Sequence, residues 1–343
     1  MGDGRILAID IGRGTQDVLV YDPAQPIENS TKLVLPSPTV VVGRAIRGAA
    51  AAGRPVHLEG PCMGGGGSVA AVRGALAAGL RVTATPSAAL TIHDDQECVR
   101  ALGVVITEDA PNGAAVVQTA DYMEGELRAA LSLFGVEYPG QVAIAVQDHG
   151  FSPHISNRVH RFAVFTSLLE AGDWDLFALV PDPPHPSMSR MRAVLAAAPG
   201  ALLTDTGPAA AIGALLDPWV ADRVEDGITL VNAGNGHTLC FTLRGSRVCG
   251  IFEHHTAALD TERLTGYIRK LQEGTLTNAE VFDDGGHGAA VREAVGKTPV
   301  AVTGPNRQRL LPGAWQAAPC GDMMLTGCFG LIEIWKRRKA GFV

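Results

Sequence analysis

The sequence of 343 residues lacks a basic excess, a long apolar run and a paired cysteine motif. Its net charge of −7 excludes a general nucleic-acid binder, whose phosphate contacts need a basic face. No apolar run reaches the ~18 residues that a membrane span needs, and no basic segment followed by an apolar one marks a secretory signal. The six cysteines form no C-x-x-C pair, so the sequence supports neither a disulfide framework nor the iron–sulfur cluster of a radical-SAM enzyme. We therefore expect a cytoplasmic protein that binds neither nucleic acid nor membrane.

The composition that remains is that of a well-packed globular protein. A hydrophobic fraction of 46% with a charged fraction of 18% supplies a core without the charge excess of a disordered chain. The length exceeds one average core and suits two domains. The 41 glycines gather at strand ends and turns instead of forming a repeat, which excludes collagen-like and low-complexity segments.

The spacing of apolar residues predicts alternating strands and helices. Strands are expected at 6–11, 18–21, 32–35, 57–59, 113–118 and 141–147, and helices at 39–52, 68–78, 120–134 and 207–216. Residues 148–192 are rich in His, Pro, Ser and Arg, and are expected to form long loops of the kind that carry function.

A glycine turn separates the first two predicted strands. Gly12 and Gly14 lack side chains that would block an anion, so backbone N–H groups can converge on a phosphate. Thr15 can add a hydroxyl donor, and Asp10 at the strand end is placed to hold Mg²⁺. Taken alone, residues 10–17 suit a phosphate-binding turn and an ordinary hairpin equally well.

A second hairpin repeats the device about 220 residues later. The apolar strand from residue 228 ends at Asn232, and a turn with Gly234 and Gly236 leads into another strand. Each turn contains a threonine, Thr15 in the first and Thr238 in the second. Two such turns suit a cleft in which each wall offers one phosphate-binding loop.

In these turns the chain resembles the ASKHA superfamily of acetate and sugar kinases, hexokinases, heat-shock chaperones and actin. Three further segments follow the order of that superfamily: 207–216 resembles its first connecting helix, 299–305 its adenosine motif, and 322–333 its closing helix. The resemblance implies an α/β fold with duplicated actin-like, ribonuclease H-like ATPase domains around a nucleotide cleft. It further implies a first domain over 1–205 with substrate-side insertions, a connecting helix at 206–226, and a second domain over 227–343.

The same resemblance implies ATP and Mg²⁺ as cofactors, with Asp10 as the residue that holds the metal and serves catalysis. The residues expected to bind the nucleotide are Asp10, Gly12, Arg13, Gly14, Thr15, Gln16, Asn232, Gly234, Asn235, Gly236, His237, Thr238, Thr303 and Gly304. Arg13 would add a fixed positive charge beside the phosphates. The chain departs from the superfamily at Asn232, where sugar kinases carry an Asp. This matters because an amide cannot accept a proton at neutral pH.

More closely, the chain resembles a prokaryotic family labelled as pyruvate formate-lyase activating enzymes. The strings that carry this resemblance are residues 147–150, 232–238, 252–256 and 321–324.

The substrate side of the cleft is expected near residues 148–161. Asp148, at the end of an apolar strand, is our candidate for a catalytic base, with capping of a turn as the alternative. His149 follows it, and Arg158 and Arg161 on the predicted loop could clamp an anionic substrate. The tetraglycine at 64–67 before a helix suits an anion cradle or a flexible turn.

A run of acid and histidine offers a second type of site. We expect Glu253, His254 and His255 on the substrate side of the cleft. Adjacent histidines on a strand point to opposite faces, so a transition-metal site would have to be completed by His237, His287 and Asp283 or Asp284. Neutral hydrogen-bonded histidines near the cleft are the alternative that the residues favour.

These features predict an ATP- and Mg²⁺-dependent phosphotransferase that acts on a small anionic metabolite. The alternatives are an ATPase that couples hydrolysis to the activation of a partner enzyme, which Asn232 favours, and a nucleotide-binding protein without turnover. The expected partner is a small-molecule substrate or the enzyme to be activated. The sequence is also compatible with a homodimer.

Overall fold

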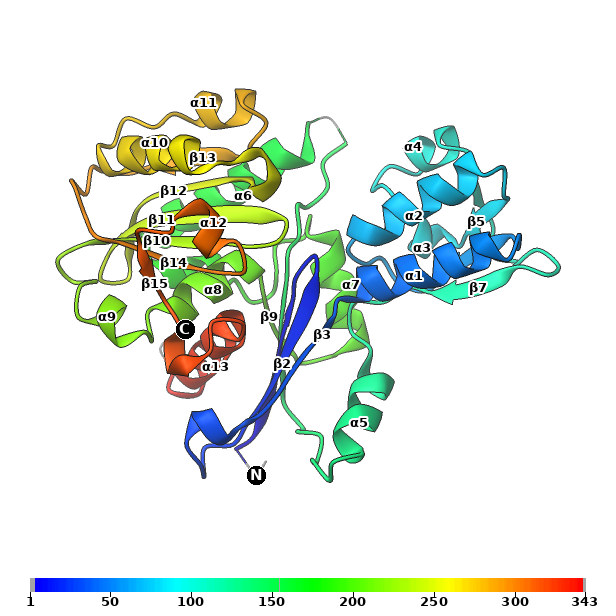
Figure 1. The fold of residues 1–343 in the computed structure, drawn as a ribbon, viewed down its shortest axis with the longest axis horizontal. Helices are drawn as coiled ribbons and strands as arrows, with labels where there is room; N and C mark the ends of the chain where they lie inside the picture. Colours follow the sequence, from blue (N-terminus) through cyan, green and yellow to red (C-terminus); the bar gives the residue numbers. More distant parts are fainter. Residues whose placement is uncertain (1–3, 154, 342–343) are drawn as a thin grey trace.

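The computed structural model describes residues 4–153 and 155–341, and its main body contains two mixed sheets (Figure 1). In the first sheet, β1 pairs antiparallel with β2, and β2 with β3, while β8 and β9 extend it on the other side in parallel. The strands are β1 (Ile6–Ile11), β2 (Thr15–Tyr21), β3 (Thr31–Pro36), β8 (Val142–Val146) and β9 (Leu202–Thr204). Buried aliphatic residues continue along β1 and β8, as expected for strands covered on both faces.

The second sheet repeats this topology strand for strand. Around β10, the pairs β10–β11 and β11–β12 are antiparallel, and β10–β14 and β14–β15 are parallel. Its strands are β10 (Ile228–Ala233), β11 (His237–Arg244), β12 (Arg247–His255), β14 (Val300–Thr303) and β15 (Trp315–Gln316), with β13 (Gly288–Val291) added outside β12. The α/β class and the duplication of an actin-like domain are therefore confirmed by strand order and direction.

A helix follows the last strand of each sheet, and these two helices pack against each other between the sheets (Figure 1). They are α8 (Thr206–Ala214) and α13 (Thr326–Lys339). A Cβ on Gly213 would overlap the carbonyl oxygen of Thr326, and one on Gly330 would overlap that of Ala209. The helices thus cross in backbone contact, which only glycine permits at these positions.

The largest hydrophobic core surrounds this helix crossing and joins both sheets through α8 and α13. Helix α13 also packs against β1, β2, β8 and β9, although its residues fall in the predicted second domain. The predicted connecting segment 206–226 contains α8 and the short α9 (Pro218–Ala221). The domain boundaries themselves stay predictions.

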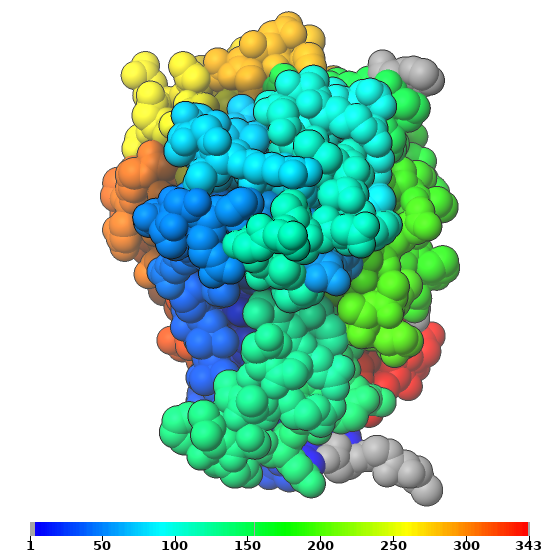
Figure 2. Space-filling view, turned by 90° about the vertical axis from the view of Figure 1, so that its right-hand side faces the viewer, coloured from blue at the N-terminus to red at the C-terminus, as the bar shows by residue number. Residues whose placement is uncertain are grey.

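A smaller α/β unit is inserted between β3 and β8 and stands to one side of the main body (Figure 1). Its parallel sheet runs in the order β6 (Val105–Ile106), β5 (Val82–Ala84), β4 (Val56–Glu59) and β7 (Ala115–Gln118). Its helices are α1 (Pro38–Ala51), α2 (Gly66–Ala77), α3 (Pro86–Ala89) and α4 (Gln96–Ala101), followed by α5 (Glu124–Ser132) on the way back to β8. The insert has its own buried core. In the space-filling view it covers the upper part of one face, in blue to cyan (Figure 2).

Two contacts fix the insert to the first glycine turn. Ser37, the residue before α1, donates its hydroxyl to the carbonyl of Arg13 at 3.0 Å and its backbone N–H to the carbonyl of Gly14 at 3.1 Å. Pro38 then starts α1, where a missing N–H costs nothing. The start of the insert is therefore positioned by the turn.

The segment 148–192 was expected to be loop, and this is wrong over much of its length. It contains α6 (Asn157–Ala171), the 3₁₀ turn η2 (Leu176–Leu179) and the first turn of α7 (Ser189–Ala197). Ser156 caps α6 through its side chain, and buried Phe162, Phe165 and Leu169 anchor the helix to the core. Polar residues in the sequence obscured this apolar stripe.

The remaining elements complete the second half and the chain ends. They are η1 (Ile27–Asn29), η3 (Thr256–Ala258), α10 (Thr261–Gln272), α11 (Asn278–Asp283), α12 (Arg307–Leu310) and η4 (Pro319–Gly321). Across the described residues, no helix has the length and apolar character needed to cross a membrane.

Candidate functional site

The two glycine turns have the same backbone geometry and line one cleft between the sheets. Gly12 donates its N–H to the carbonyl of Thr15 at 2.9 Å, and Gly234 donates to that of His237 at 3.0 Å. Cross-strand pairing places Asp10 opposite Asp17 in one hairpin. In the other it places Asn232 opposite Leu239. His237, and not Thr238, therefore occupies the position that Thr15 holds in the first turn.

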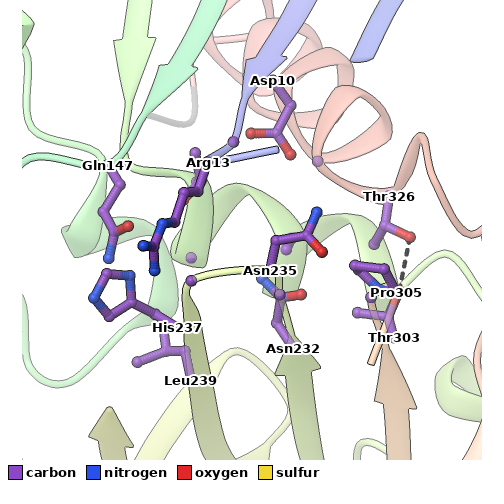
Figure 3. A pocket seen from close by; sticks show the side chains of 18 of the residues that line it. Asp10, Arg13, Gln147, Asn232, Asn235, His237, Leu239, Thr303, Pro305 and Thr326 are labelled. Carbon is purple, nitrogen blue, oxygen red and sulfur yellow. Dashed lines mark hydrogen bonds between the residues drawn. The ribbon is translucent and has the colours of Figure 1, made fainter. Parts of the chain in front are cut away.

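The turns face each other closely across the cleft. A Cβ on Gly14 would lie 2.9 Å from Nδ2 of Asn235, and one on Gly236 would lie 3.1 Å from Cδ of Arg13. Each turn thus places one side chain over a glycine of the other, and any larger residue would push the walls apart. Figure 3 shows the polar groups that result, with Asp10 across from Asn232 and Asn235, and with Arg13, Gln147 and His237 to one side.

Two carboxylates in the first hairpin fit a divalent cation. Asp10 and Asp17 both line the cleft, and one oxygen of each is buried without a hydrogen-bond partner. Burial, and then the carboxylates of Asp17 and Asp205, raise the pKa of Asp10 well above its ordinary value. Burial raises the pKa of Asp17 to about 7. A hard cation such as Mg²⁺ would supply the missing partner and relieve the repulsion, and Asp10 and Asp17 are the residues that would hold it.

The predicted adenosine motif also reaches this cleft. Thr303 pairs in parallel register with Asn232, and its hydroxyl lies 3.0 Å from that of Thr326 on α13. Gly304 has a φ of +92°, and a Cβ there would lie 2.5 Å from the carbonyl oxygen of Ala233. Only glycine suits this turn.

The cleft is narrow in this conformation. It offers water molecules about 100 Å³, less than the roughly 300–1,000 Å³ of ordinary ligand pockets. One reason is that α13 approaches the first hairpin very closely at Gly327. A Cβ at this position would overlap the carboxylate of Asp10. In this conformation the cleft is therefore smaller than a whole nucleotide requires.

Two predicted nucleotide residues point away from the cleft. Gln16 is buried, and its amide donates to the carbonyl of Pro36 at 3.3 Å. Thr238 is fully buried, and its hydroxyl pairs with that of Thr256 at 3.0 Å. Alternation along a strand explains both corrections, since Thr15 and Asp17 share the cleft face and Gln16 lies on the opposite one.

Arg161, predicted to clamp a substrate, is instead engaged in buried ion pairs at the cleft. It lies on α6 with 1% of its surface exposed, and its guanidinium bridges Asp205 at 2.7 Å and Glu253 at 2.7 Å. It also donates to the carbonyl of Asp148 at 2.6 Å. Burial alone would lower its pKa, but the two carboxylates raise it, so the charge persists. The donors are committed to a buried ion-pair network that joins the two halves.

Glu253 belongs to the same network. Burial would raise its pKa, but Arg161 and the nearby His287 and His237 lower it. Its second contact is with Gln147, whose amide donates to it at 3.0 Å. The predicted substrate role of Glu253 is therefore replaced by that of a buried anion at the back of the cleft.

Two further predicted substrate residues lie elsewhere. Arg158 donates to the carbonyl of Gly286 at 2.5 Å and stacks on Phe282, so it supports the loop before β13. His254 is fully buried and lies 3.2 Å from a carboxylate oxygen of Asp284. It faces away from the cavities because its neighbour His255 takes the open side of β12.

A second cavity adjoins the cleft, between the insert and the main body. Its volume is about 440 Å³, and it shares Gly12, Arg13, Gln147 and His237 with the cleft. The tetraglycine contributes the start of α2 to its wall. The predicted residues His149 and His255 also line it.

Asp148 lines this cavity, but backbone amides hold its carboxylate. Its two oxygens accept from Gly150 at 2.8 Å and from Met191 at 2.9 Å. Burial raises its pKa, and these amides act against the rise. The geometry favours a turn cap, and the assignment of Asp148 as catalytic base stays a prediction.

Three carboxylates that the sequence did not single out lie at or behind the two cavities: Asp17 lines the cleft, Asp94 lines the second cavity, and Asp205 holds Arg161 behind them. Asp17 could have been found from its strand face, and Asp205 from its place before α8, where it accepts the N–H of Gly207 at 3.0 Å. No motif in the sequence around Asp94 marks it as a site residue. It lies in the insert and accepts from Asn157 at 2.9 Å and Ser189 at 3.1 Å across the second cavity.

A family described as "Putative pyruvate format-lyase activating enzyme (DUF1786)" matches residues 63–309, which is more than half of the chain. The chain belongs to this family. No curated protein matches the sequence. Within the described residues, the group of three or more potential metal ligands is formed by histidines, and no cysteine contributes to it.

Solved structures with a similar arrangement include three that differ strongly in sequence. They are a Ppx/GppA phosphatase of Aquifex aeolicus (10% identity, TM-score 0.32, 88% of this chain and 68% of that one), the ethanolamine utilization protein EutJ of Carboxydothermus hydrogenoformans (15%, 0.34, 96% and 90%), and a Bacteroides thetaiotaomicron protein with an actin-like ATPase fold and unknown function (7%, 0.31, 88% and 83%). The assignment of the fold rests on the strand order described above.

Proposed function

We propose that this protein is an ATP- and Mg²⁺-dependent phosphotransferase that acts on a small anionic metabolite. The observation that carries the proposal is the junction of two cavities. The cleft between the glycine turns and the cavity under the insert share Gly12, Arg13, Gln147 and His237. A phosphate held by the first turn would therefore lie next to a molecule held in the second cavity.

The nucleotide side follows from the paired turns. Asp10 and Asp17 suit the cation, and the backbone N–H groups of the glycine turns suit phosphate oxygens. Because the closed cleft is narrow, binding must be coupled to separation of the two sheets. The crossing of α8 and α13 joins the sheets and is the natural pivot for such a motion.

The acceptor side follows from charge and reach. Arg13 lines both cavities, and among the described residues its guanidinium has no hydrogen bond or ion pair, so it can neutralise an anion. Asp94 is the better base candidate in the second cavity. Burial raises its pKa, and its partners are side chains that can rotate away, unlike the backbone amides at Asp148.

The test is ADP release from ATP and Mg²⁺ with and without a panel of small phosphorylatable carboxylic acids and sugars. Release that requires one of these molecules supports the proposal, and calorimetry that detects no nucleotide binding would contradict it. Asp94→Asn should bind ATP normally and lose transfer. Asp148→Asn should mainly lose stability, and the reverse pattern would return the base to Asp148.

A second candidate is an ATPase that hydrolyses ATP to activate a partner enzyme. Asn232 favours it, since the second turn offers no carboxylate to accept a proton, and the description of the family names an activating enzyme. In the same assay this function gives slow ADP release that no metabolite stimulates. Stimulation by a metabolite would instead exclude it as the main activity.

A further inference from the structure

Four histidines from distant segments meet where the cleft joins the second cavity. His149 follows β8, His237 starts β11, His255 ends β12 and His287 precedes β13. The rings of His237 and His287 have centroids 4.7 Å apart, and those of His255 and His287 are also 4.7 Å apart. One ring nitrogen from each of His149, His237 and His287 lies within 4.8 Å of the others. Three metal-ligating atoms therefore converge on one point.

The hydrogen bonds of this cluster are incomplete. The Nε2 atoms of His149 and His287 lie 2.9 Å apart, so one ring donates to the other. Both nitrogens of His237 and Nδ1 of His287 are buried with no partner. A neutral imidazole carries one donor and one acceptor, and burying them unpaired costs free energy. The cluster would be satisfied by a group that accepts lone pairs from several rings at once.

The charges around the cluster favour a cation. The buried network behind it contains one positive group, Arg161, and two negative ones, Asp205 and Glu253. That network carries one net negative charge, and a neutral imidazole is the form that binds metal ions.

We propose that His149, His237 and His287 bind one divalent transition-metal ion of the Zn²⁺ class. Nitrogen ligands at 2.0–2.1 Å from a tetrahedral ion lie roughly 3.3 Å from one another, which small ring rotations reach from the observed separations. Three imidazoles without thiolate suit Zn²⁺ and its neighbours better than Mg²⁺. Cys62, in the same cavity, does not compete, because burial keeps its thiol protonated.

Two of the three proposed ligands, His149 and His237, line the second cavity, so a fourth ligand can reach the metal from there. His255 stands beside it and is half-buried, and its ring centroid lies 4.9 Å from that of His237. The fourth coordination position can therefore be taken by His255 or by an oxygen donor of a molecule in the cavity. A three-histidine site with such an opening is the arrangement of catalytic zinc sites, whereas structural sites are closed.

The experiment uses the full chain, stripped with a chelator and kept free of nucleotide. Calorimetric titration with Zn²⁺ should give one equivalent, a higher melting temperature, and, with Co²⁺ instead, the visible bands of tetrahedral nitrogen coordination. His237→Ala and His287→Ala should each weaken binding by more than about 10-fold. The control is His185→Ala, an exposed histidine bonded to Ser187 outside the cluster, which should bind like the wild type.

Absence of saturable one-equivalent binding to the wild type would overturn the proposal, whether or not the variants fold. Equal affinity in the variants and in the control would overturn it as well, as would a cobalt spectrum with thiolate bands. Nucleotide affinity is measured separately on the metal-free chain. Loss of the proposed ATP function and loss of the metal site are therefore distinct outcomes.

Discussion

The two hairpins of the cleft share one backbone and differ in charge. Asp10 and Asp17 in the first correspond to Asn232 and Leu239 in the second, by the same cross-strand register. The first hairpin therefore offers two carboxylates for a cation, and the second offers an amide and an apolar side chain. The duplicated geometry supplies two similar turns, while the side chains place both carboxylates that could hold a cation on one wall only.

The helices that end the two halves differ in a similar way. Gly207 of α8 packs against Leu239, and Gly327 of α13 packs against Asp10. Helix α8 thus touches the second hairpin at an apolar residue, and α13 touches the first hairpin at an acidic one. A change at the crossing should therefore affect the acidic wall and the neutral wall unequally.

The largest expected effect is on the helix crossing itself. Gly330→Ala places a methyl group into the backbone of α8 and should destabilise the protein by about 3 kcal/mol or more. The control is Gly266→Ala on α10, where a Cβ meets nothing within 4 Å and should stabilise by about 0.5–1 kcal/mol. Urea unfolding measures both, and equal stabilities would show that the helices are not in backbone contact.

The next effect separates the acidic wall from the neutral one. Asp10→Asn should weaken Mg²⁺-dependent ATP binding by more than about 100-fold, since loss of a ligand exceeds the 10–100-fold cost of losing an outer-shell partner. Asn232→Ala should weaken it far less. Calorimetry with ATP and Mg²⁺ measures both, with Asp22→Asn, a partly exposed residue after β2, as control. Similar losses at Asp10 and Asn232 would mean that the walls contribute equally.

A pH dependence should appear in the acidic wall of the metal-free protein. The pKa of Asp17 is raised by burial from 3.8 to about 7, so the fold favours the protonated form. Its contribution to stability is complete below about pH 4 and is lost as the pH rises through about 7. Unfolding with urea in EDTA should show this loss in the wild type and much less of it in Asp17→Asn. An unchanged slope in that variant would assign the titration to another group.

The smallest effect compares the two threonines of the turns. Thr15→Val should weaken nucleotide binding, because Thr15 lines the cleft. Thr238→Val should cost about 1 kcal/mol of stability through the lost hydrogen bond to Thr256 and leave nucleotide affinity unchanged. Calorimetry and urea unfolding on both variants give the result. A fall in affinity in Thr238→Val would place its hydroxyl in the cleft.

Local pattern was sufficient to predict strands β1, β2 and β3 and the position of both glycine turns. The predicted strand at 6–11 matches β1 (Ile6–Ile11), because a continuous apolar run between polar ends has few other structures available. The loop expected at 148–192 failed for the opposite reason. Helix α6 carries His and Arg among its apolar residues, which hides its apolar pattern in the sequence. Ion pairs with Glu253 and Asp205, both far away in the chain, bury one of these arginines.

The two hairpins, their glycines and the order of the elements around them follow from the amino-acid sequence, because each depends on residues close together in the chain. Which side chains share a site depends on the packing of the whole fold. Arg161 and Glu253 are separated by 92 residues, and His149 and His287 by 138. The pairing of such groups depends on how sheets and helices pack. Periodicity along one strand or helix gives the face of a residue and leaves its partners undetermined.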